Sequence, residues 1–193
     1  MYDKLKENIK LLVDISDVDF NSFTTYLSPI SIKRRTKLLI QGEKPQSMYF
    51  VQKGLLYNYH TTADGDQHVV QIAKENYWMG DVSGHMNNPK SNFNIEALED
   101  SELLELDFGN FDKMCEEIPI FERYFRILIQ NAYYHILNRL VLTDIQSAEE
   151  QYFKIMENNP DLILRTPQKI IASYIGIKPQ SLSRIKKNAF SQK

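Results

Sequence analysis

Residues 166–187 read TPQKIIASYIGIKPQSLSRIKK, and this stretch decides the fold of the C-terminal part of the chain. Thr166 is expected to cap a helix over Pro167–Tyr174, because threonine is a favoured N-cap residue. Pro167 suits the first helical turn, where its missing N–H costs nothing. Gly176 suits a turn that needs a left-handed residue, and a second helix follows over Pro179–Lys187. The apolar residues expected to face inward recur at helical spacing: Ile170, Ile171, Tyr174, Leu182 and Ile185. These features predict a helix-turn-helix.

The polar side chains of this segment are expected to project outward, where they could bind nucleic acid. Gln180, Ser181 and Arg184 are the predicted base contacts, because glutamine pairs bidentately with adenine and arginine with guanine. Phosphate contacts are expected from the other polar and basic side chains: Gln168, Lys169, Lys178, Ser183, Lys186 and Lys187. The alternative is a plain antiparallel helix pair with a solvated basic face, although such a face usually includes acidic residues.

Charge is distributed unevenly along the 193 residues, although the net charge is only −2. Seven of the 23 basic residues lie between Arg165 and Lys193, and all 25 acidic residues lie before Arg165. A basic segment on an acidic body suggests a polyanionic partner such as double-stranded DNA; a solvated basic tail is the alternative that charge alone leaves open.

The first half of the chain carries the signals of short antiparallel strands. Asp64-Gly65 predicts a two-residue hairpin in which both residues have positive φ. Ser16 and Asp19 resemble a capping box that opens a short helix ending near Tyr26. Alternating apolar and polar residues mark the expected strands: Ser47–Gln52, Leu55–His60, Gln67–Ala73 and two pieces within Ile95–Asp107. Residues 30–107 are therefore predicted to form an antiparallel β-roll of the jelly-roll, or double-stranded β-helix, type.

A long helix is predicted over Ile120–Leu142, which contains neither glycine nor proline. Its apolar residues fall on two faces, so the helix needs two partners. The roll can cover one face, and a second copy of the chain can cover the other; a helix fully buried within one chain is the alternative. The predicted homodimer interface is Phe121, Phe125, Leu128, Ala132, Ile136 and Leu140.

The predicted class is α+β with three parts. Residues 1–115 form a roll that acts as a sensor, 116–145 a dimerisation helix, and 146–193 a helix-turn-helix domain. In the last part, Gln146–Asn158 is expected to be helical and Asp161–Arg165 extended. Five residues follow Asn188, too few for a complete β-hairpin wing.

This order of elements resembles the Crp/Fnr superfamily of bacterial transcription regulators. The residues that carry the resemblance are Gln41–Glu43, Tyr49–Gly54, Gly80-Asp81, Ile171–Ile177 and Leu182–Ile185. The resemblance implies a homodimeric, sequence-specific DNA-binding regulator of transcription, with RNA polymerase as a further partner. It also implies a pocket of the cyclic-nucleotide type in the roll.

The effector pocket implied by the family would include Gly80, Asp81, Lys90, Ser91 and Asn92. Ser91 stands where the family has its phosphate-binding arginine, and Lys90 is the only nearby cation. A cyclic phosphate would lack its bidentate guanidinium partner, so cyclic AMP is not the expected effector. The effector is left unidentified, and no cofactor is predicted.

Other classes are less well supported by the residues. The lone Cys115 excludes the multi-cysteine iron–sulfur site of the oxygen sensors, whereas a haem ligand at His60, His68, His85 or His135 stays open. No catalytic motif is present, so an enzyme is not expected. No apolar run reaches ~18 residues and no signal core follows the N-terminus, which favours a cytoplasmic protein without membrane contact. The functional alternative is a ligand-binding or protein-interaction module with a vestigial helix-turn-helix.

Overall fold

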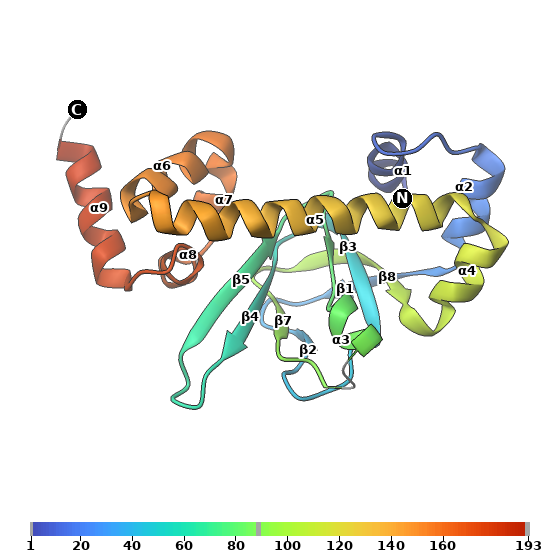
Figure 1. The fold of residues 1–193 in the computed structure, drawn as a ribbon, viewed down its shortest axis with the longest axis horizontal. Helices are drawn as coiled ribbons and strands as arrows, with labels where there is room; N and C mark the ends of the chain where they lie inside the picture. The colour runs from blue at the N-terminus through green and yellow to red at the C-terminus, as the bar shows by residue number, and fades with distance from the viewer. Residues whose placement is uncertain (1, 88–89, 192–193) are drawn as a thin grey trace.

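A computed structural model describes residues 2–87 and 90–191 of the chain. A β-roll lies beneath one long helix, α5, with α1, α2 and α4 at one end of that helix and α6–α9 at the other (Figure 1). The helices are α1 (Asp3–Lys10), α2 (Asp17–Thr24), α3 (Val82–Asn87), α4 (Phe111–Glu117), α5 (Ile120–Ile145), α6 (Ala148–Asn158), α7 (Pro160–Arg165), α8 (Gln168–Tyr174) and α9 (Pro179–Ser191), with a 3₁₀ turn η1 (Phe108–Asn110). None of the helices in the described part of the chain is long and apolar enough to cross a membrane.

Two four-stranded antiparallel sheets form the roll. One has the order β1-β8-β3-β6, and the other has the order β2-β7-β4-β5. The strands are β1 (Leu27–Ile32), β2 (Lys37–Leu39), β3 (Ser47–Lys53), β4 (Leu56–Thr61), β5 (Gln67–Ala73), β6 (Trp78–Met79), β7 (Asn94–Ala97) and β8 (Ser101–Asp107). Their side chains alternate between two faces, and one face of each sheet fills the interior. The predicted α+β class with an antiparallel roll is confirmed.

The turn between β4 and β5 differs from the predicted two-residue hairpin. The N–H of Thr62 donates to the carbonyl of Asp66, so three residues form the loop. Only Gly65 has a positive φ, at 85°, and Asp64 does not share it. This is the pattern of a three-residue loop, in which a glycine takes the left-handed position at the end.

The first half of α5 is part of the main core. Phe121 and Tyr124 are fully buried and Phe125 nearly so, packed with residues of α1, α2, α4 and the roll. The ring of Phe121 stacks on that of Phe23 with centroids 3.8 Å apart. Assigning Phe121 and Phe125 to an interface between two copies was therefore wrong, because both side chains pack inside their own chain.

The remaining predicted interface residues become progressively more exposed along α5. Leu128 is half-buried at the edge of the main core, whereas Ala132, Ile136 and Leu140 are exposed. Helical periodicity identifies buried-type positions, but it does not say which surface covers them.

The C-terminal helices follow the predicted order with two corrections. Asp161–Arg165 belongs to the helix α7 and is not extended, because Pro160 suits its first turn. Thr166 does not cap α8; Pro167 takes that position, and the buried Thr166 hydroxyl has no partner among the described residues. Gly176 has the predicted left-handed conformation, with φ of 77°, between α8 and α9. Lys193, the last of the basic residues, lies outside the described residues.

Tyr124→Phe tests the polar contact inside the main core. The Tyr124 hydroxyl accepts from Trp78 Nε1 at 2.9 Å and donates to Asn8 Oδ1 at 2.6 Å. Its removal leaves two polar groups unpaired, so the free energy of unfolding should fall by ~1–3 kcal/mol in urea titrations. Tyr133→Phe, at an exposed position of the same helix, is the matched control and should change it little. Equal stability of both variants would contradict this account.

Candidate nucleic-acid interface

Helix α9 lies at one end of the molecule, on the side away from the roll (Figure 1). Leu182 is buried against α8 and Ile185 is half-buried, so these residues anchor the inner face of the helix. Gln180 and Arg184, four residues apart, are both exposed and therefore share the outer face. Ser181 and Lys186 are half-buried, and the other predicted contacts on this helix, Ser183 and Lys187, are exposed. Most of the predicted contact residues are thus accessible from outside.

The predicted phosphate contacts outside α9 differ in their accessibility. Lys169 and Lys178 are exposed. Gln168 instead supports the start of α9: its Nε2 atom donates to the carbonyl of Pro179 at 3.3 Å and to Ser183 Oγ at 2.6 Å. These bonds hold the start of the exposed helix against α8.

Arg165 contributes less positive charge to this surface than the sequence indicated. Its guanidinium forms bidentate contacts with Glu75 at 2.9 and 3.0 Å, binds Glu99, and pairs with Asp161 at 2.7 Å. Burial raises the pKa of the Glu75 carboxyl, but hydrogen bonds from Arg165 and from the Gly54 N–H outweigh it and bring that pKa to about 2. Arg165 therefore joins α7 to the roll, and its charge is neutralised there.

The C-terminal helix pair, α8 and α9, is supported by the roll through α8. Ile170 and Tyr174 of α8 pack on the outer face of the β4–β5 sheet, against the stacked rings of Tyr57 and Tyr59. Ser173, between these apolar residues, bonds to the backbone of β5, and Arg139 of α5 does the same. Sequence reasoning missed both residues, because no local pattern shows that a serine or an arginine will bind a distant strand.

At the expected effector pocket, polar groups form hydrogen bonds to other residues of the same chain. Ser91 and Asp81 are both buried, and Ser91 Oγ donates to Asp81 Oδ2 at 2.6 Å. The other carboxylate oxygen accepts from the N–H of Gly84 at 2.8 Å. Lys90 and Asn92 are exposed, and the Asn92 carbonyl lies 2.8 Å from His60 Nδ1. Gly80 packs so closely on Met48 that a Cβ atom would lie 2.7 Å from the Met48 Cβ. The five residues are thus near one another, but the Asp81 carboxylate is bound internally.

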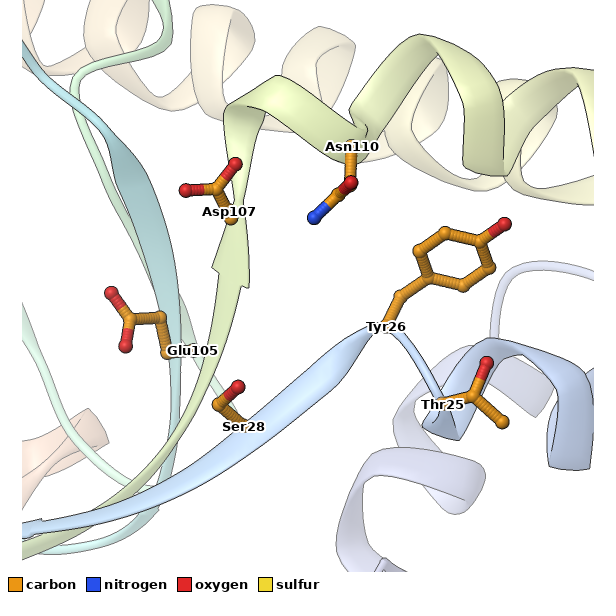
Figure 2. A pocket seen from close by; sticks show the side chains of 6 residues that line it. All are labelled: Thr25, Tyr26, Ser28, Glu105, Asp107 and Asn110. Atoms are coloured by element: carbon orange, nitrogen blue, oxygen red, sulfur yellow. The ribbon is translucent and has the colours of Figure 1, made fainter.

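The interior of the roll holds a cluster of packed apolar side chains: Leu39, Tyr49, Val51, Leu56, Ala73, Met79, Ile95, Ala97 and Leu103. An open recess of about 420 Å³ lies beside β8 and is lined by Thr25, Tyr26, Ser28, Glu105, Asp107 and Asn110 (Figure 2). Its lining includes two carboxylates and no basic residue. Burial and the nearby Glu105 carboxylate raise the pKa of Tyr49 to about 12. The lining of this recess therefore disfavours a phosphate group.

The histidines and the cysteine show no arrangement typical of a metal centre. In the described part of the chain, no group of three His, Cys, Asp or Glu side chains could hold a metal ion. His60 faces His68 across the β4–β5 pair, and the ring of His85 stacks on Phe108 at 4.5 Å. Burial raises the pKa of the Cys115 thiol to about 11, so the thiol stays protonated and weakly nucleophilic.

Comparisons with known proteins agree with this architecture. The family described as cyclic nucleotide-binding domain matches residues 29–118. FixK2 from Bradyrhizobium japonicum has a similar structure, with a TM-score of 0.75 and 15% identity over 86% of this chain and 85% of that one. The c-di-GMP responsive global regulator CLP from Xanthomonas campestris gives a TM-score of 0.74 and 10% identity over 92% and 93%. A CooA mutant from Carboxydothermus hydrogenoformans gives a TM-score of 0.70 and 15% identity over 94% of this chain and 87% of that one.

No curated protein matches the sequence. The structural likeness extends over most of the chain, and it agrees with the resemblance carried by the sequence motifs. Residues 29–118 thus match the cyclic nucleotide-binding domain family, and the overall fold is similar to those of FixK2, CLP and CooA.

Proposed function

We propose that this protein is a homodimeric, sequence-specific DNA-binding regulator of transcription of the Crp/Fnr type. The observation that carries the proposal is the exposed face of α9, which presents Gln180 and Arg184 beside lysines and, from Arg165 onward, no acidic residue. CLP, one of the proteins with a similar fold, is described as a global regulator of gene expression, which supports the same role here.

Two groups of side chains on the helix pair would have different tasks. Arg184 can present its planar guanidinium to guanine O6 and N7, and Gln180 can present its amide to adenine. The lysines at positions 169, 178, 186 and 187 would bind phosphates, which adds affinity without sequence information. Gln168 would orient α9 through its bond to Ser183.

Arg184→Ala tests base reading against phosphate binding. Genomic fragments retained by the wild-type protein would first supply a specific site for gel-shift titrations. The variant should lose ~1–3 kcal/mol of discrimination at one base pair per half-site and keep its affinity for random DNA. Lys187→Ala is the matched control and should weaken all sequences alike, with a smaller salt dependence.

If Arg184→Ala instead lowers the affinity for specific and for random DNA equally, then Arg184 binds a phosphate. The base contact would then come from Gln180 or Ser181. A wild-type protein that retards no fragment would favour the interaction module with a vestigial helix-turn-helix.

The second half of α5 is the surface proposed to bind a second copy. Its exposed apolar side chains include Tyr133, Ile136, Leu137 and Leu140. The first half of the same helix is covered by its own chain, so a partner helix would continue an apolar stripe that the roll leaves open. A dimer would place its two copies of α9, the helix proposed to read the bases, about one DNA turn apart, ~34 Å, which a monomer cannot do.

Ile136→Glu should dissociate this dimer at micromolar concentration, because the substitution buries a charge in the contact. Sedimentation velocity measures the change, and binding to a two-half-site fragment should fall with it. Asn131→Glu is the control, since position 131 lies on α5 about 140° around the helix axis from position 136. A wild-type protein that sediments only as a monomer would rule the dimer out.

Cyclic AMP is not proposed as the effector, since the chain has no arginine at Ser91 and Asp81 is already bound by Ser91. Calorimetric titration of the purified protein with cyclic AMP should therefore show no binding in the micromolar range. A well-defined isotherm with micromolar affinity would contradict this reading of the pocket.

A further inference from the structure

Strand β5 is the edge of its sheet, and backbone groups of Gln67, Val69 and Val70 are bound by side chains instead of by another strand. Ser173 Oγ accepts from the N–H of Val69 at 3.0 Å and donates to the carbonyl of Gln67 at 2.6 Å. One hydroxyl thus supplies both the acceptor and the donor that a neighbouring strand would provide. Since Ser173 lies on α8, these two bonds attach the helix pair directly to the sheet edge.

Arg139 reinforces the same attachment from the long helix. Its guanidinium donates to the carbonyl of Val69 at 3.2 Å, to the carbonyl of Val70, and to the carbonyl of Tyr174 at 2.7 Å. It also lies over the Tyr174 ring, 4.2 Å from the centroid. One side chain therefore binds α5, the β5 edge and the end of α8 to one another.

The contacts around these two residues make it costly to separate the helix pair from the roll. Ile170 and Tyr174 cover the apolar outer face of the roll on either side of Ser173. At the far end of the interface, Arg165 binds Glu75 and Glu99, and Lys74 donates to Asn159 at 2.7 Å. Undocking would expose this apolar face and leave the bound backbone groups of β5 to water.

We propose that Ser173 and Arg139 are positioning residues that hold α8 and α9 on the β5 edge in the arrangement that reads DNA. This inference rests on the proposed function. In it, α9 is placed by direct bonds between the roll and α8, so DNA binding needs no effector for that step. The internally bound Asp81 and the apolar cluster inside the roll agree with a roll that acts as a platform.

The physical consequence is pre-organisation. Without its contacts to the roll, the segment α6–α9 would be joined to α5 mainly through the short connection at Gln146 and Ser147. DNA would then have to restrict that motion on binding, which lowers affinity. A looser connection would also tolerate half-sites at altered spacing, because each helix pair could shift on its own.

The test uses the full-length, dialysed protein and a two-half-site fragment selected with the wild type. Ser173→Ala is compared with Ser22→Ala, an exposed serine of α2, and Arg139→Gln with Arg123→Gln, an exposed arginine of the same helix. Each variant is measured for exchange of the Val69 amide, for affinity at the native spacing, and for affinity with one base pair inserted or removed.

Ser173→Ala should raise Val69 amide exchange by about tenfold, since that N–H loses its acceptor. DNA affinity at the native spacing should fall roughly five- to tenfold, as expected for a lost hydrogen-bonded attachment. The ratio of affinities between native and altered spacing should shrink, which a variant that is merely less stable would not show. Arg139→Gln should act in the same direction, and both controls should behave as wild type.

Two results would overturn the inference. If Val69 exchange rises while affinity and spacing preference stay unchanged, docking on β5 has no part in DNA reading. If affinity rises instead, the docked arrangement inhibits binding. Either result leaves the proposed function intact. A wild-type protein that binds no DNA would contradict both the proposed function and this inference.

Discussion

The aromatic packing of the first half of α5 is the constraint on which the rest of the structure depends. Phe121, Tyr124 and Phe125 join this helix to α1, α2, α4 and the roll in one core. An α-helix of 26 residues is stiff over its length, so anchoring one half fixes the direction of the other. The direction of the exposed second half is therefore set by contacts made at the opposite end of the molecule (Figure 1).

The attachment of the helix pair to the roll depends on hydrogen bonds as well as on apolar packing. The helix pair does meet an apolar surface, Tyr57 and Tyr59, but its register on the roll is determined by hydrogen bonds to the backbone of β5. Apolar contacts are non-directional and would allow sliding, whereas bonds to specific N–H and C=O groups do not. The combination explains how a small domain, linked by a short connection, can have one defined position.

Local sequence patterns predicted the elements well and the contacts between elements poorly. Alternation located the strands, and the spacing around Gly176 located the helix pair, because both depend on nearest neighbours along the chain. The same reasoning assigned Phe121 and Phe125 to a second copy, since periodicity reports burial without naming the partner. Arg165 was counted as charge for DNA, although Glu75 and Glu99 neutralise it from 90 and 66 residues away. At the pocket, the absence of arginine at Ser91 was visible in the sequence, but its bond to Asp81 was not.

The capped edge of β5 also bears on the solubility of the protein. Exposed edge strands pair readily with strands of other molecules, and proteins usually blunt them with charges, prolines or covering elements. Here the covering elements are α8, through Ser173, and α5, through Arg139. A roll cut off after α5 would lose the bonds from Ser173 to the Val69 N–H and the Gln67 carbonyl, beside an uncovered aromatic patch at Tyr57 and Tyr59. The helix pair that we propose to read nucleic acid would thus also protect the roll from strand-to-strand aggregation.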